Sequence, residues 1–194
     1  MVMRQGSDGS GGLQKREGRV IAKHTELEDS VILFDDFMGK LKDSGFVFDE
    51  KKHRILEIGA GKGKLFRHLK DEGYMIEAID AKPPPDADPE VRKGMPESLP
   101  FENGRFRVVF GIKVFDATFY LDQTPEKQKA MLREIMRVLE SDGALRADRE
   151  MERFAGMEAH GVTLDLIERP RGERSAPDEW AGVLNGVVLR KYPE

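Results

Sequence analysis

Apolar residues recur along the chain in two patterns, one with the period of a helix and one in the short runs typical of buried strands. The first helical pattern follows Thr25-Glu26-Leu27-Glu28, which has the form of a capping box. Spacings of three and four residues then place four apolar side chains on one helix face, Phe34, Phe37, Met38 and Leu41. Gly45 is well placed to end this helix.

Between residues 54 and 148, apolar runs alternate with helical patterns. The expected strands cover 54–58, 74–79, 107–112 and, more weakly, 144–148. One helical pattern covers 62–72, and another begins with Thr124 and Pro125, a good N-cap and first helical residue, and runs to about Leu139. This alternation predicts an α/β fold with a mostly parallel sheet and helices on both of its faces.

The two ends of the chain differ from this middle part. Residues 1–18 are rich in glycine, serine and charge, and we expect a disordered tail there. The remainder, 19–194, is expected to be a single domain that begins with the N-terminal helix. Residues 151–160 have a helical pattern, whereas 162–168 and 186–192 are strand-like with no convincing helix between them. We therefore expect a C-terminal antiparallel hairpin at the edge of the sheet.

The composition of the chain argues against several classes of function. The 194 residues are 39% hydrophobic and 35% charged, with a net charge of −4, so no overall basic excess favours nucleic acid. The chain has no cysteine, which excludes disulfides, thiolate metal sites and a cysteine nucleophile. No histidine and carboxylate cluster has metal-ligand spacing. No apolar run approaches the roughly 20 residues of a membrane span, and the first residues do not form a signal peptide. A cytoplasmic location is the simplest expectation.

A glycine-rich loop is the main candidate for binding. Glu57-Ile58-Gly59-Ala60-Gly61-Lys62-Gly63 follows an expected strand and opens an expected helix. Its glycines stand two residues apart, unlike the G-x-G-x-x-G pattern of dinucleotide-binding folds, so a nicotinamide cofactor fits less well. Glycines let the backbone approach a ligand closely and adopt positive φ. The alternative is a glycine turn that holds no ligand.

Asp80 ends the second expected strand, at the sheet edge where ligands of open α/β sheets bind. A carboxylate at this position can accept hydrogen bonds from both hydroxyls of a ribose. The alternative is an exposed acid that caps the loop.

Several segments in this order resemble the class I S-adenosylmethionine (SAM) methyltransferases, nearest the ubiquinone and menaquinone biosynthesis group. The resemblance extends from about Ile55 to Asp148. The stretch ILEIGAGKGKL resembles the family's first motif, and Asp80 matches its acidic residue after the second strand. Three later segments also match, namely Gly94–Phe101, Arg105–Val109, and Leu132–Leu139 followed by Asp142-Gly143. The resemblance implies a Rossmann-like three-layer sandwich and SAM as cofactor.

The resemblance also implies roles for individual residues. Glu57 and the backbone of Gly59, Ala60, Gly61 and Gly63 would face the methionine end of SAM. The ribose would lie at Asp80 and Ala81, the adenine between Met95 and Pro96, and the methyl group near Gly111 and Ile112. Met95 stands where the family has an acid that reads the adenine amino group, and Arg107 stands where it has an aspartate. Arg146 and Asp148 put charge into a normally apolar fifth strand, which we therefore expect to be short or at a ragged edge.

The methyl acceptor is less well defined by the sequence. No Asn-Pro-Pro-Tyr segment follows the fourth expected strand, and the candidates for acceptor binding there are Lys113, Asp116 and Tyr120. His24 is a further candidate, because the N-terminal segment often covers the acceptor pocket in the family. The leading hypothesis is a SAM-dependent methyltransferase that acts on a small-molecule acceptor. The alternatives are a diverged, non-catalytic protein that binds SAM or a protein partner, and methylation of a protein or RNA.

Overall fold

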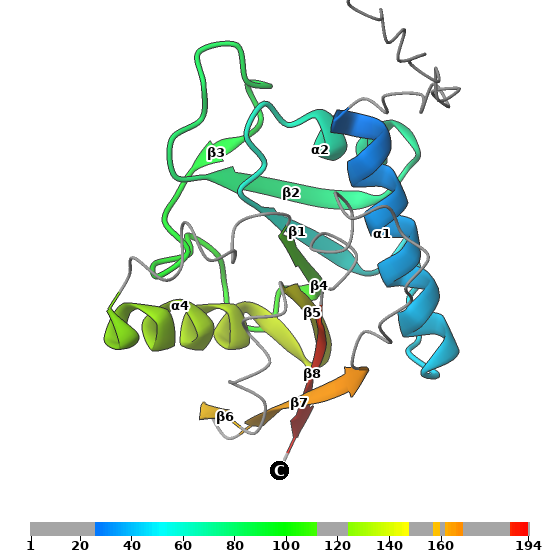
Figure 1. Ribbon diagram of the computed structural model, residues 1–194, viewed down its shortest axis with the longest axis vertical. Helices are drawn as coiled ribbons and strands as arrows, with labels where there is room; N and C mark the ends of the chain where they lie inside the picture. The colour runs from blue at the N-terminus through cyan, green and yellow to red at the C-terminus, as the bar shows by residue number, and fades with distance from the viewer. Residues whose placement is uncertain (1–25, 112–123, 148–156, 160–161, 169–186, 194) are drawn as a thin grey trace, which may run out of the picture.

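The computed structural model describes residues 26–111, 124–147, 157–159, 162–168 and 187–193 (Figure 1). The tail predicted for residues 1–18 and the capping residue Thr25 lie outside this part. The helices are α1 (Glu26–Asp43), α2 (Lys64–Asp71) and α4 (Pro125–Val138). The strands are β1 (Arg54–Ile58), β2 (Met75–Asp80), β3 (Arg92–Lys93), β4 (Phe106–Gly111), β5 (Leu139–Ala147), β6 (Met157–Ala159), β7 (Val162–Glu168) and β8 (Val187–Pro193).

The described strands form one sheet in the order β3-β2-β1-β4-β5-β8-β7-β6. The first five strands in this order are parallel, which confirms the predicted parallel sheet. Ile58 at the end of β1 pairs with Ile79 of β2 and with Gly111 of β4. The carboxyl ends of the three neighbouring strands β2, β1 and β4 therefore lie level with one another at one edge of the sheet (Figure 1).

The last three strands are antiparallel to their neighbours. β8 pairs with both β5 and β7, and β6 pairs with β7. The helix expected over 151–160 is wrong where the structure describes it, because residues 157–159 form β6; pairing of this backbone with β7 overrides the helical apolar pattern. Residues 169–186, which join β7 to β8, lie outside the described part, so a direct hairpin between these strands stays a prediction.

The strand β5 also differs from the expectation. It begins at Leu139 and lies between β4 and β8, so a short strand at a ragged edge is wrong. The charge of Arg146 is accommodated there, since its Nη1 donates to the Gly111 carbonyl at 3.1 Å and its guanidinium lies over the Phe110 ring. Asp148 lies outside the described residues.

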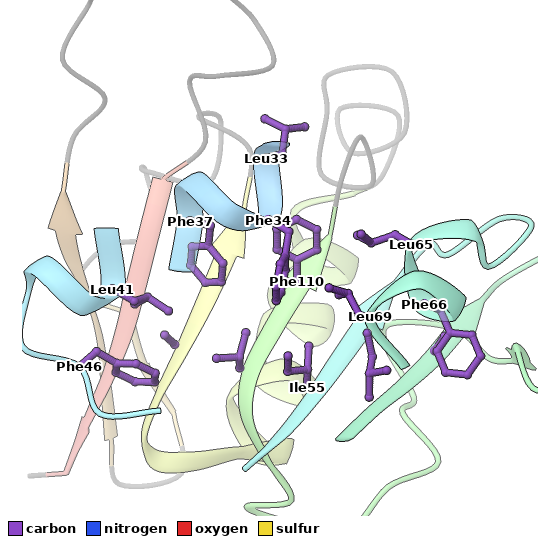
Figure 2. Close-up of a cluster of buried hydrophobic side chains, with 14 of the residues drawn as sticks. Leu33, Phe34, Phe37, Leu41, Phe46, Ile55, Leu65, Phe66, Leu69 and Phe110 are labelled. Carbon is purple, nitrogen blue, oxygen red and sulfur yellow. The ribbon is translucent and has the colours of Figure 1, made fainter. Parts of the chain in front are cut away.

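Helices cover both faces of the sheet, so the fold has three layers (Figure 1). On one face α1 and α2 bury a cluster in which the rings of Phe34 and Phe110 meet edge to face, 5.5 Å apart (Figure 2). On the other face α4 packs Leu132 and Ile135 into a second cluster. Full burial of each such side chain contributes about 1.5–3 kcal/mol, so the two clusters fix the helices on the sheet.

The helix ends follow the expected local chemistry. Gly45 has a φ of 78°, and the N–H of Phe46 reaches back to the Leu41 carbonyl at 3.0 Å, which is a Schellman end for α1. At the start of α4 the side chain of Thr124 accepts from the N–H of Lys127 at 3.4 Å.

Arg107 is buried at the amino end of β4, where the family resemblance led us to note an unusual charge. Its Nε donates to the Val47 carbonyl at 3.2 Å, and its Nη1 pairs with Asp142 and lies 3.6 Å from a Glu140 oxygen. Its guanidinium also lies 4.5 Å from the centre of the Phe46 ring. Arg107 therefore joins the segment after α1 to the start of β5, at the end of the sheet opposite the glycine loop.

Candidate functional site

The glycine loop leaves β1 and turns back against β2. The N–H groups of Gly59 and Ala60 both donate to the Ile79 carbonyl, at 2.9 and 3.0 Å. Gly59, Gly61 and Gly63 have φ values of 75°, 55° and 74°. This left-handed region costs residues with a Cβ about 1–2 kcal/mol each, so three glycines in alternate positions are what the turn requires.

Gly61 and Gly63 have different surroundings. A Cβ on Gly63 would lie 2.6 Å from Val91 Cγ2 and 3.0 Å from Asp88 Cβ, so this glycine is needed for packing. A Cβ on Gly61 would meet nothing within 4 Å. The backbone at Gly61 therefore borders space that a ligand can enter, whereas Gly63 packs against Val91 and Asp88.

Asp80 holds this loop from the end of β2. Its Oδ2 accepts from the N–H of Gly61 at 2.8 Å, its Oδ1 accepts from the N–H of Lys82 at 2.7 Å, and its backbone carbonyl accepts from Gly94 at 3.0 Å. The structure thus shows the loop-capping contact that the sequence left as an alternative. It does not exclude a ligand, because each carboxylate oxygen can accept a second hydrogen bond.

Glu57 lies beneath the loop with 7% of its surface exposed. Its carboxylate accepts from the backbone N–H of Phe66, in the first turn of α2, so it supplies the cap that Gly63 lacks. Among the described residues, its Oε2 has no hydrogen-bond partner. Burial, aided by the nearby charge of Asp80, raises the pKa of Glu57 to about 8, against the opposing effect of the Phe66 N–H.

A second loop follows β3 on the other side of Asp80. It begins at Gly94 and makes a tight turn in which the N–H of Ser98 donates to the Met95 carbonyl at 3.0 Å. Met95 is 45% exposed although it is a large apolar residue, whereas Pro96 is buried. Through Gly94 and Asp80, this turn is linked to the glycine loop.

The structure brings together most of the residues that the sequence assigned to a cofactor. Glu57, the glycine loop and Asp80 are joined directly, Ala81 follows Asp80, and Met95 and Pro96 lie in the attached turn. Gly111 ends β4 beside Ile58. The remaining candidates lie outside the described residues and stay predictions, namely Ile112, Lys113, Asp116, Tyr120 and His24.

Two contacts at this site were not found by sequence reasoning. The Ile79 carbonyl anchors the start of the glycine loop, and the Phe66 N–H binds Glu57. Both use backbone atoms, so no residue type marks them. In the described part of the chain, no three histidine or acidic side chains are grouped to hold a metal, and no helix there is long and apolar enough to cross a membrane.

Comparison with known proteins agrees with this geometry. Residues 56–147 match the family described as "Methyltransferase domain", and this match includes the glycine loop, Asp80 and the Met95 turn. Residues 56–147 of this chain are therefore a methyltransferase domain. Its sheet and helices form the Rossmann-like fold of the class I SAM-dependent methyltransferases. The sequence comparison does not single out the ubiquinone-type group, and no curated protein matches the chain.

Solved structures show the same fold at low sequence identity. Magnesium protoporphyrin IX methyltransferase from Synechocystis PCC 6803, with bound SAM, has a TM-score of 0.53 and 11% identity, over 89% of this chain and 86% of that one. The CurJ carbon methyltransferase has a TM-score of 0.54 and 15% identity, over 86% of this chain and 54% of that one.

Proposed function

We propose that this methyltransferase holds SAM over Gly61, between the carboxylates of Glu57 and Asp80 and the exposed Met95, and transfers its methyl group to a small-molecule acceptor. The observation that carries the proposal is the capping of α2 by Glu57. In dinucleotide-binding folds the N-terminus of this helix receives a phosphate. Here the buried Glu57 takes that place, so the site suits a ligand that has no phosphate and whose ammonium group would favour the charged form of Glu57.

The parts of SAM fit the residues that surround the open space. The ammonium group of its methionine moiety would donate to the free Oε2 of Glu57, which leaves the Phe66 contact intact. The ribose hydroxyls would donate to the second lone pairs of Asp80. The adenine ring would pack on Met95, which supplies contact area and no hydrogen bond.

The cofactor supplies a methyl group that is displaced in line, and the chain positions the reactants and excludes water. Gly111 ends β4 beside the glycine loop, and its carbonyl is held by the buried Arg146. The acceptor would approach over the segment that begins at Ile112. Lys113, Asp116, Tyr120 and His24 remain the proposed acceptor-binding residues.

The test is a transfer assay on the full chain with SAM labelled in its methyl group. The acceptors are a panel of small oxygen, nitrogen and carbon nucleophiles, with protein and RNA fractions in parallel. We expect label in a small molecule, and none with Gly61→Arg. Label only in protein or RNA would contradict the acceptor class. SAM binding without any transfer would contradict the catalytic role.

A further inference from the structure

The helix α4 is hydrogen-bonded to the loop that carries Met95, although the helix and the loop lie far apart in sequence. The N–H of Leu99 donates to Glu134 Oε2 at 3.0 Å, and the Leu99 carbonyl accepts from Arg137 Nη2 at 3.0 Å. Arg137 Nη1 donates to the Phe101 carbonyl at 2.8 Å. One helical turn thus binds both backbone polar groups of Leu99 and the carbonyl of Phe101.

The side chains of Glu134 and Arg137 are also hydrogen-bonded to each other. Arg137 Nε and Nη2 donate to the two oxygens of Glu134, at 2.9 and 2.8 Å. Both side chains are mostly buried, with 20% and 24% exposed. Glu134 raises the pKa of Arg137 by accepting these bonds, so the guanidinium stays charged. Bidentate arginine–carboxylate pairs of this kind are strong and directional, so they hold the side chains of Glu134 and Arg137 in fixed positions beside the loop.

The other end of the loop is held by the cofactor site itself. Gly94 donates to the Asp80 carbonyl at 3.0 Å. The turn from Met95 to Ser98 is therefore held between two anchors, Asp80 before it and the α4 pair immediately after it. A methionine side chain does not hydrogen-bond the adenine amino group as an acid does. The contribution of Met95 to cofactor binding therefore depends on how closely it packs against the adenine ring. Dispersion contacts lose a quarter to a half of their energy over a gap of about 0.5–1 Å.

We propose that Glu134 and Arg137 are positioning residues that hold the Met95 turn against the adenine of SAM, and thereby set the affinity of the site for the cofactor. The inference rests on the proposed SAM site and adds to it the reason why an apolar residue can replace an acid at this position. In the proposed site neither residue would touch the cofactor.

The experiment combines calorimetry with methyl NMR on the full chain, with S-adenosylhomocysteine as the ligand. Arg137→Gln is compared with Arg133→Gln, an exposed arginine on the same helix. Loss of the charge-assisted bonds from Arg137 to the Leu99 carbonyl, the Phe101 carbonyl and Asn103 Oδ1 should raise Kd about tenfold in Arg137→Gln. Kd should be unchanged in Arg133→Gln. With 13C-labelled methionine methyls, assigned by Met95→Leu, the adenine ring current should shift the Met95 signal in the wild type and shift it less in Arg137→Gln.

The buried Met131 methyl on α4 reports whether the helix stays folded in each variant. If Arg137→Gln does not fold, Glu134→Gln serves instead, because its amide oxygen still accepts from Leu99 while its charge pair with Arg137 is lost. A wild-type Kd together with a full Met95 shift in the folded variant overturns the inference. A Met95 methyl that does not move when the wild type binds also overturns it. No binding by the wild type overturns the proposed SAM site instead, so the two failures are distinguishable.

Discussion

The Asp80 carboxylate holds the glycine loop closed, because its Oδ2 accepts the backbone N–H of Gly61 at 2.8 Å. The same side chain is the proposed acceptor for the ribose, so one residue supports the loop and faces the ligand. Because of this double role, a substitution of Asp80 should change both the stability of the protein and its affinity for the cofactor.

Asp80→Ala should lower the free energy of unfolding by about 1–3 kcal/mol, because the N–H groups of Gly61 and Lys82 lose their acceptor. It should also abolish measurable binding of S-adenosylhomocysteine. Asp80→Asn is the matched control, since its amide oxygen can still accept from Gly61. Urea unfolding and calorimetry measure the two effects. Equal stability of the wild type and Asp80→Ala would show that the loop does not depend on this contact.

Gly61 and Gly63 should respond differently to the same substitution. Gly63→Ala forces a Cβ into Val91 and Asp88 and should destabilise the protein by about 2–4 kcal/mol, from steric overlap and positive φ together. Gly61→Ala meets open space and should cost only the conformational term of about 1–2 kcal/mol. Urea unfolding of both variants measures the difference. A larger loss for Gly61→Ala would contradict the described loop.

The buried Glu57 makes stability depend on pH. Its pKa rises from an ordinary value of 4.5 to about 8 on folding, so the folded state binds this proton more tightly than the unfolded state. Its stabilising contribution is therefore complete below pH 4.5, falls as the pH rises to about 8, and is constant above that. Glu57→Gln should remove this part of the pH dependence. Unfolding free energies of both proteins between pH 5 and about 9 test it; parallel curves would rule out a raised pKa.

Arg107 should matter for stability and not for the cofactor. Arg107→Met removes a buried guanidinium from Asp142, Glu140 and the Val47 carbonyl. The two carboxylates left behind are partly exposed, so the free energy of unfolding should fall by about 1–3 kcal/mol. The glycine loop lies at the opposite end of the sheet, so Kd for S-adenosylhomocysteine should stay within about twofold where the protein is folded. A selective loss of affinity would show that the two ends of the sheet are coupled.

Much of the fold was predictable because its signals are local. The apolar run at 54–58 marks a strand and Gly45 marks a helix end, and the structure has both at those positions. Residues 157–159 gave the wrong prediction, since their strand forms only by pairing with β7. Arg146 also misled, because the Gly111 carbonyl and Phe110 ring that receive its charge are about 35 residues away in sequence.

The site was predictable to a similar extent. The spacing of the glycines and the position of Asp80 were enough to predict the loop, because its turns require glycine and its acceptor requires a carboxylate. The hydrogen bond by which Glu57 caps α2 and the hydrogen bonds from α4 to Leu99 were not predicted, because one partner in each of them is a backbone atom. The segment Leu132–Leu139 was predicted as part of a helix and as a family resemblance, and the contacts of Glu134 and Arg137 give two of its residues a physical role.

The most direct test of the SAM site is calorimetric titration of the wild type, Gly61→Arg and Gly45→Arg with S-adenosylhomocysteine. Both glycines have positive φ and open space beside them, so the two substitutions carry a similar conformational cost, but only Gly61 lies in the proposed site. We expect one site in the wild type, an unchanged Kd in Gly45→Arg, and no binding in Gly61→Arg. Retained affinity in a folded Gly61→Arg, or no binding by the wild type at roughly millimolar ligand, would contradict it.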